Sequence, residues 1–122
     1  MKRTILLVDD SAAARMKGRA LLTSHKNYEL VSACDGEEGL EKALAHSPDL
    51  ILMDVEMPRM TGIEVCRTLR QNVRTKNTPI ILLSMRAEAA IMKAGFDSGC
   101  SEYILKPLNE AKLLSVLEKY LP

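Results

Sequence analysis

Five polar side chains lie at or just after the ends of apolar segments in this 122-residue sequence. They are three carboxylates, a hydroxyl and an ammonium, namely Asp9, Asp10, Asp54, Ser84 and Lys106. Carboxylates that lie close together repel one another, and one of them takes up a proton unless a cation joins them. Mg²⁺ suits such a set because it prefers carboxylate oxygens and commonly takes a phosphate oxygen as well. Neither histidine is placed to suggest zinc or iron instead.

The same residue types can accept a phosphoryl group. A carboxylate can act as the nucleophile, which gives an aspartyl phosphate, and a lysine and a hydroxyl can hold the remaining phosphoryl oxygens. This reaction depends mainly on positioning and on neutralising charge. Taken singly, each residue has a more ordinary explanation as a helix cap, a turn former or a solvated surface residue. Five of them at one end of one sheet favour a phosphoryl site instead.

The segments that must position these residues are strands alternating with helices. Unbroken apolar runs are typical of strands buried on both faces of a parallel sheet, and they occupy residues 5–8, 50–53, 79–83 and 103–105. Residues 28–33 are only partly apolar and predict an edge strand. Four of the intervening segments begin with a helix-capping residue: Ser11, Asp35, Thr61 and Asn109. Residues 87–94 are rich in alanine and methionine and predict a fifth helix, which should stop near Gly95 or Gly99.

Strict alternation of strands and helices predicts an α/β fold, with a doubly wound, five-stranded parallel sheet and helices on both faces. In such open sheets, ligands bind beyond the carboxyl ends of the strands. The polar residues that end the strands should therefore meet at one edge of the sheet. No linker, repeat or low-complexity stretch divides the sequence, so we expect a single domain over residues 1–122.

The composition argues against several other classes of protein. A net charge of +1, with both signs interspersed, argues against a nucleic-acid-binding surface. The three cysteines are far apart and form no C-x-x-C pair, which argues against disulfides or a zinc site and suits a cytoplasmic protein. The apolar runs are far shorter than the ~20 residues that span a membrane. The first residues lack the features of a signal peptide.

Several motifs occur together along the chain: an acidic pair at residues 9–10, Asp54, a Met-Pro-Arg-Met-Thr-Gly loop at residues 57–62, Ser84, and a segment from glycine to Lys-Pro at residues 99–107. As an ordered set they resemble the receiver domain of two-component response regulators, including the single-domain chemotaxis type. The loop is similar to that family's M-P-x-M-x-G loop, and the last segment to its G-x-x-x-[YF]-x-x-K-P segment. The resemblance covers residues 4–120 and implies a flavodoxin-like sheet of strand order 2-1-3-4-5 with five helices.

The resemblance implies a role for each site residue. Asp54 would be the phosphoacceptor, and Lys106 would hold a phosphoryl oxygen. Mg²⁺ would be bound by Asp54, by Asp10 directly, by Asp9 directly or through water, and by the backbone carbonyl of Glu56.

The resemblance also implies a switch. The Ser84 hydroxyl would move to hydrogen-bond the phosphoryl group, and Tyr103 would rotate inward to follow it, although a half-buried packing tyrosine is the plainer interpretation. The peptide bond between Lys106 and Pro107 would be cis. The surface that changes would be built from the fourth helix, the fifth strand and the fifth helix, at residues 86–96, 101–105 and 109–120.

The implied function is that of a phosphorylation-dependent signalling switch. The phosphoryl group would come from a phosphohistidine on a sensor histidine kinase or phosphotransfer protein, or from a small acyl phosphate. The altered surface would control a protein target or an output domain. The domain would catalyse only its own phosphotransfer and autodephosphorylation, so we do not expect an enzyme with a separate substrate. We expect a monomer, with dimerisation on phosphorylation as the alternative, no direct nucleic-acid binding and no membrane insertion.

Three residues near the site are expected to modulate it. Met85 is bulkier than the alanine or glycine common at its position in the family, so it should narrow access to the phosphoryl group. Glu56 and Arg86 occupy variable positions that influence dephosphorylation in the family. We expect these two to form an ion pair across the mouth of the site, contributing about 0–1 kcal/mol if exposed. With Met85, this pair should lengthen the phosphorylated lifetime.

Three other functions stay open at this level. A phosphatase of the haloacid-dehalogenase type also uses Asp, Ser or Thr, Lys and Mg²⁺. It needs D-x-D after its first strand, where this chain has Asp9-Asp10-Ser11. A nucleotide- or flavin-binding module would carry G-x-G-x-x-G or a P-loop there, and this chain has neither. An interaction domain that works without phosphorylation shares the fold, and only binding assays separate it.

Overall fold

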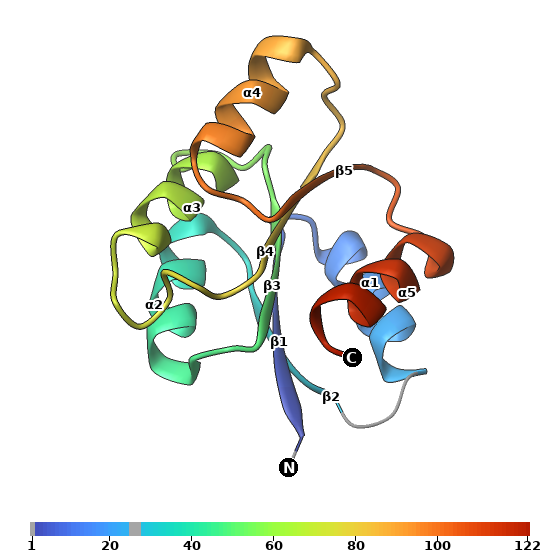
Figure 1. Ribbon diagram of the computed structural model, residues 1–122. Coiled ribbons are helices and arrows are strands. Elements are labelled where there is room, and N and C mark those ends of the chain that lie inside the picture. The colour runs from blue at the N-terminus through green and yellow to red at the C-terminus, as the bar shows by residue number, and fades with distance from the viewer. Residues whose placement is uncertain (1, 25–27) are drawn as a thin grey trace.

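The computed structural model describes residues 2–24 and 28–122, and its five strands form one parallel sheet (Figure 1). The strands are β1 Arg3–Val8, β2 Tyr28–Ala33, β3 Leu50–Asp54, β4 Ile80–Ser84 and β5 Glu102–Leu105. Their order is β2-β1-β3-β4-β5, and each neighbouring pair is parallel. The predicted fold class and strand order are confirmed.

Five helices cover the sheet in the described part of the chain: α1 Ala12–Thr23, α2 Gly36–His46, α3 Gly62–Arg70, α4 Ala89–Asp97 and α5 Glu110–Tyr120. In Figure 1, α1 and α5 lie on one face of the sheet and α2 and α3 on the other, with α4 beyond α3. This two-sided cover explains the apolar runs of β3 and β4, which are buried along their whole length, whereas the apolar run of the edge strand β5 is only partly buried, contrary to expectation. The edge strand β2 is only partly buried, as its composition predicted.

Two apolar clusters, one on each face, form the core. Successive side chains of a strand point to opposite faces, so β1 sends Leu6 into the cluster with Val65 of α3 and Ile5 into the cluster with Leu113 of α5. Fully burying such an aliphatic side chain stabilises the fold by about 1.5–3 kcal/mol. The sheet is thereby held from both sides, which fixes the strand ends that carry the site.

The four predicted helix caps are present. Ser11, Asp35, Thr61 and Asn109 each accept a hydrogen bond from the backbone N–H three residues later. At α3 the capping box is complete, because the Glu64 carboxylate also accepts from the Thr61 N–H at 3.0 Å. At α2 the Glu38 carboxylate instead accepts from the N–H of Cys34, one residue before the cap. A cap of this kind contributes about 1 kcal/mol.

The fourth helix differs from the prediction. α4 begins at Ala89 and ends at Asp97, later at both ends than residues 87–94. The side chain of Glu88, its N-cap, makes no hydrogen bond to the helix, so the sequence carries no capping signal for its start. Gly95 lies inside the helix rather than at its end, and a Cβ there would stand 2.9 Å from Cδ2 of Tyr103, so the glycine makes room for that ring. The helix stops just before Gly99, whose φ of +98° suits glycine.

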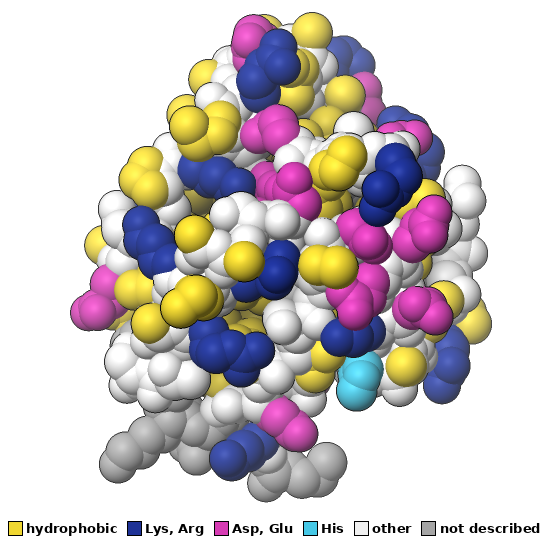
Figure 2. Space-filling view, turned by 180° about the vertical axis from the view of Figure 1, so that it is seen from behind, with side chains coloured by type: hydrophobic (Ala, Val, Ile, Leu, Met, Phe, Trp, Pro, Cys, Tyr) yellow, Lys and Arg dark blue, Asp and Glu magenta, His cyan; other side chains and the backbone are white. Residues whose placement is uncertain are grey.

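The surface carries both signs of charge. On the described residues of the face in Figure 2, lysine and arginine side chains are interspersed with acidic and apolar ones. This mixture agrees with the net charge of +1. Within the described residues, no helix has both the length and the apolarity needed to cross a membrane.

Candidate functional site

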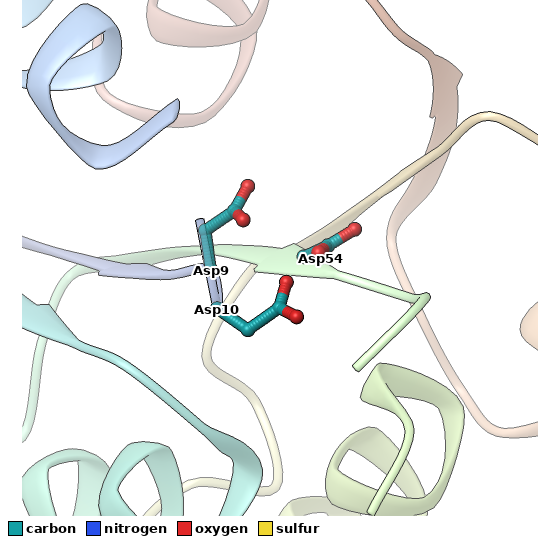
Figure 3. Close-up of side chains that lie close together, drawn as sticks. All are labelled: Asp9, Asp10 and Asp54. Carbon is teal, nitrogen blue, oxygen red and sulfur yellow. The ribbon is translucent and has the colours of Figure 1, made fainter. Parts of the chain in front are cut away.

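The three aspartates expected to bind a metal come together beyond the carboxyl ends of β1 and β3 (Figure 3). One carboxylate oxygen each of Asp9, Asp10 and Asp54 lies within 4.8 Å of the other two. Strand register explains this meeting, because Val8 of β1 pairs with Met53 of β3, each one residue before an aspartate. Asp9 and Asp54 are buried, whereas Asp10 is exposed.

Lys106 reaches this carboxylate cluster from the end of β5. Its Nζ lies 2.9 Å from Oδ1 of Asp54 and 3.3 Å from Oδ2 of Asp9. The contact with Asp54 is an ion pair, and apart from it Oδ1 has no hydrogen-bond partner among the described residues. The ammonium offsets part of the cost of burying this acceptor. The Lys106–Pro107 peptide bond is cis, as the resemblance implied.

The electrostatics of the site oppose full ionisation of Asp54. Burial raises the pKa of its carboxyl to about 7, and repulsion from Asp9 adds to this, although contact with Lys106 acts in the other direction. Burial also acts to lower the pKa of the Lys106 ammonium, but the carboxylates of Asp54 and Asp9 outweigh it and hold that pKa above its usual value. Near neutral pH, the protonated and the ionised forms of the Asp54 carboxyl are therefore both populated. A nearby cation would favour the ionised form.

The donor set fits a hard divalent cation. It offers three oxygens, one from each of three carboxylates, and no sulfur or imidazole ligand. Asp54 also carries the oxygen without a hydrogen bond. The raised pKa of this carboxyl means that its negative charge is poorly stabilised, and a bound cation would stabilise it. Mg²⁺ meets these conditions, since it prefers carboxylate and phosphate oxygens and keeps several water ligands.

The start of α1 holds Asp9 in place. Asp9 Oδ1 accepts a hydrogen bond from the backbone N–H of Ser11 at 2.9 Å, while the guanidinium of Arg15 donates to the Asp9 carbonyl at 2.7 Å. The predicted cap Ser11 thus also positions a site carboxylate. Arg15 is a site-supporting residue that the sequence did not reveal, because an arginine in a first helical turn looks like any solvated side chain.

The loop after Asp54 packs tightly against the strand that carries it. The N–H of Gly62 donates to the carbonyl of Val55 at 3.1 Å. A Cβ at Gly62 would collide with the backbone carbonyl oxygen of Asp54. This is a close approach of two backbone segments that only glycine allows. The glycine of the predicted M-P-x-M-x-G loop therefore serves to bring α3 up against Asp54.

Ser84 is engaged by a second carboxylate. Its hydroxyl donates to Oε2 of Glu56 at 2.6 Å, and the N–H of Met85 donates to Oε1 of the same side chain at 2.8 Å. The Ser84 oxygen also accepts from the N–H of Arg86 at 2.9 Å. Ser84 was expected to serve the phosphoryl site, and Glu56, Met85 and Arg86 to modulate it; the bond between the Glu56 carboxylate and the Ser84 hydroxyl was not predicted.

The prediction of an ion pair between Glu56 and Arg86 is wrong. The Arg86 guanidinium pairs with Glu88, with Nε 3.1 Å from Oε1. Glu56 instead binds the Ser84 hydroxyl and the Met85 N–H, which are short, fixed donors at the end of β4. The long Arg86 side chain is exposed and meets a carboxylate two residues away at lower cost in side-chain entropy. The predicted lengthening of the phosphorylated lifetime therefore loses this ion pair as a cause.

Tyr103 joins the same network from β5. Its hydroxyl donates to the carbonyl of Arg86 at 2.8 Å, and its ring is half-buried against α4, with the Phe96 ring centroid 6.3 Å away. Tyr103 is thus a half-buried packing residue, and its hydroxyl also contacts the segment that follows Ser84. Met85 is exposed and lines a cavity of about 270 Å³ that also reaches Asp9 and Lys106.

Comparison with known proteins agrees with this geometry. The sequence matches the family described as the response regulator receiver domain over residues 5–118. The response regulator ArlR of Staphylococcus saprophyticus is 37% identical over 115 residues, which cover 94% of this chain and 50% of that protein. The chain thus spans about half the length of the curated relatives that it matches.

Solved structures give the same result. Chemotaxis protein CheY4 of Vibrio cholerae superposes with a TM-score of 0.91 at 34% identity, covering 99% of this chain and 100% of that one. The receiver domain of sensor histidine kinase PA1611 of Pseudomonas aeruginosa gives a TM-score of 0.89 at 28% identity, covering 98% of both chains. With its sheet order, its acidic cluster and these matches, the chain belongs to the receiver-domain family of two-component response regulators.

Proposed function

We propose that this chain is a phosphorylation-controlled switch that accepts a phosphoryl group on Asp54. The observation that carries the proposal is the state of that carboxylate. It is buried, its Oδ1 lacks a hydrogen bond, and it lies 2.9 Å from the Lys106 ammonium and beside Asp9 and Asp10. A nucleophile held in this way needs little rearrangement to meet phosphorus.

The proposed donor is a phosphohistidine of a sensor histidine kinase or a phosphotransfer protein. A carboxylate oxygen of Asp54 attacks the phosphorus, and the P–O bond forms as the P–N bond breaks. The electron pair of the broken bond leaves with the imidazole nitrogen. In this proposal Lys106, 2.9 Å from Asp54, holds one phosphoryl oxygen, and the Ser84 hydroxyl donates to another. The chain itself is the acceptor and acts on no separate substrate, so we propose a signalling domain rather than an enzyme.

We further propose Mg²⁺ as the metal, held by Asp9, Asp10, Asp54 and the backbone carbonyl of Glu56. When bound, Mg²⁺ neutralises negative charge on the transferring group. The acidic cluster supports this, as do two structural relatives. The PA1611 receiver domain is described with a magnesium ion coordinated in its active-site cleft. A Borrelia burgdorferi CheY is described in a complex with CheX, BeF₃ and Mg²⁺.

The proposed output surface is formed by α4, β5 and α5. Phe96 of α4 and Leu105 of β5 expose apolar side chains there, and Tyr103 of β5 is half-buried next to them. The Tyr103 hydroxyl donates to the Arg86 carbonyl, and the Arg86 N–H donates to the Ser84 oxygen. The backbone of Arg86 therefore connects this surface to Ser84. We propose a protein target for this surface.

Intact mass after incubation with acetyl phosphate tests the proposal. The parent should gain one phosphoryl group with Mg²⁺ and none without it, and Asp54→Asn should gain none. Asp49→Asn is the matched control, because Asp49 is an exposed aspartate at the opposite end of β3 and should leave the gain unchanged. Phosphorylation of Asp54→Asn, or none of the parent in the presence of Mg²⁺, would contradict the proposal.

A further inference from the structure

Glu56 uses both carboxylate oxygens on the end of β4. Oε2 accepts the Ser84 hydroxyl at 2.6 Å, and Oε1 accepts the Met85 N–H at 2.8 Å. Hydrogen bonds to a carboxylate at such distances are charge-assisted and about twice as strong as neutral ones. Glu56 itself is only partly buried, and these two hydrogen bonds hold its carboxylate at the end of β4.

The donors that Glu56 occupies lie beside the phosphoacceptor. Asp54 pairs with Leu83 across β3 and β4, and the N–H of Val55 donates to the Leu83 carbonyl at 2.9 Å. Ser84 and Met85 follow Leu83 directly. A phosphoryl group on Asp54 would present three oxygens, and Lys106 reaches the side of Asp54 with Oδ1. The Ser84 hydroxyl and the Met85 N–H are the donors that the β4 side offers to the remaining oxygens.

The same contacts extend to the output surface. The Arg86 N–H donates to the Ser84 oxygen at 2.9 Å, and the Tyr103 hydroxyl donates to the Arg86 carbonyl at 2.8 Å. Glu56 therefore fixes Ser84, Ser84 fixes the backbone of Arg86, and that backbone holds the tyrosine hydroxyl. A chain of this kind has a defined first link, the bond between a carboxylate and a hydroxyl.

We propose that the Glu56 carboxylate is an internal competitor of the phosphoryl group: it holds the Ser84 hydroxyl and the Met85 N–H until the phosphoryl oxygens displace it. The inference rests on the proposed function, since it needs a phosphoryl group at Asp54. Repulsion between the added negative charge and Glu56 assists the displacement, and the partly exposed side chain can turn to solvent. Ser84 is then free to bind the phosphoryl group, and Arg86 and Tyr103 lose their fixed partner.

The experiment compares the parent with Glu56→Ala and Glu56→Asp. Aspartate keeps the charge but is one methylene shorter, so it cannot reach both donors. The probe is beryllofluoride with Mg²⁺, whose dissociation constant is measured by calorimetry. Removing a competing charged hydrogen bond should tighten binding about tenfold in both variants. Glu41→Gln, an exposed glutamate on α2, is the matched control and should bind as the parent does.

A second readout needs neither metal nor phosphoryl group. In metal-free protein, NMR resonances of the Met85 amide and the Tyr103 ring should shift in both Glu56 variants. The Tyr103 shift should point toward its position in the beryllofluoride-bound parent. This follows because the contact chain loses its first link without any ligand at Asp54.

The outcomes separate the two proposals. If the parent accepts a phosphoryl group and binds beryllofluoride, but Glu56→Ala binds no tighter and leaves Tyr103 unchanged, the competitor is overturned and the proposed function stands. If Glu56→Ala binds tighter but Glu56→Asp behaves as the parent, the effect is one of charge alone and the competitor is again overturned. If the parent neither binds nor is phosphorylated, the proposed function fails, and the inference fails with it.

Discussion

The two ends of the sheet, where the strands begin and where they end, differ in how their buried charged groups are hydrogen-bonded. At the end where the strands begin, the Arg70 guanidinium donates to the carbonyls of Gly99 at 2.7 Å, Thr78 at 2.6 Å and Thr75 at 3.1 Å. At the end where the strands end, Asp54 is buried with one oxygen that lacks a hydrogen bond. One end holds a charge whose donors are used, and the other a charge that is only partly compensated. The first end of the sheet therefore contributes stability, and the second is where we propose the phosphoryl chemistry.

The largest change in stability should come from removing the Arg70 hydrogen bonds, at the end of the sheet where the strands begin. Arg70→Ala removes one guanidinium and leaves the carbonyls of Gly99 and Thr78 without this donor, while the Thr75 carbonyl keeps the Thr78 N–H. We expect the free energy of unfolding to fall by about 2–4 kcal/mol, measured by urea denaturation. Arg74→Ala, at an exposed arginine nearby, should change it by less than about 0.5 kcal/mol. Equal losses in the two variants would mean that Arg70 acts only through its charge.

A substitution of Asp54, at the end of the sheet where the strands end, should raise the free energy of unfolding instead. Asp54→Asn removes a buried carboxylate, so metal-free protein should gain about 1–3 kcal/mol of stability at pH 8. The pKa of Asp54 is about 7 in the folded state, against 3.8 for a free side chain. Between these values the folded state binds more protons, so parent stability falls as pH rises through that window.

The pH dependence gives the control for that gain. The difference between parent and Asp54→Asn should be small near pH 4, grow through the window and level off above pH 7. Urea denaturation at a series of pH values measures it. A difference that stays constant over this range would show that the Asp54 carboxyl has an ordinary pKa.

Adding Mg²⁺ should reduce the contrast between the two ends of the sheet. A cation at the aspartates relieves their repulsion, so the parent should gain about 1.4 kcal/mol at a free Mg²⁺ concentration ten times its dissociation constant. Asp54→Asn has lost one carboxylate of the set and should gain less. Thermal unfolding with and without Mg²⁺ checks this, with Ca²⁺ as a comparison ion. An equal gain in both proteins would place the bound ion elsewhere.

The smallest effect should come from the same charge change at the other end of β3. Asp49 is exposed, and its Oδ2 accepts the Thr4 N–H at 2.8 Å. An asparagine can accept the same hydrogen bond, so Asp49→Asn should alter the free energy of unfolding by less than about 0.5 kcal/mol at any pH between 5 and 8. A pH-dependent gain like that of Asp54→Asn would show that burial is not what distinguishes the two aspartates.

The predictable part of the molecule is the part encoded by side-chain type and spacing. Apolar runs gave four strands, capping residues gave the starts of four helices, and the polar residues at the strand ends gave Asp9, Asp10, Asp54 and Lys106 as one cluster. The start of α4 was misplaced because its N-cap, Glu88, makes no side-chain hydrogen bond to the helix.

Most of the contacts that escaped prediction have backbone atoms as partners. Arg70 binds the carbonyls of Gly99, Thr75 and Thr78, and Arg15 binds the carbonyl of Asp9. Every residue has a carbonyl, so residue types alone carry no sign of such partners. The choice of Glu56 for Ser84 over Arg86 likewise depends on the path of the chain after β4, which spacing does not specify.

The missing cap of α4 sets how easily that helix frays. Of the five helices in the described part of the chain, the other four have a side chain bonded to an amide of the first turn. Without that bond, opening the first turn of α4 costs about 1 kcal/mol less than opening a capped one. The amide proton of Met92, bonded to the Glu88 carbonyl, should therefore exchange with solvent deuterium faster than that of Gly39 in α2, which is bonded to the carbonyl of the capping residue Asp35.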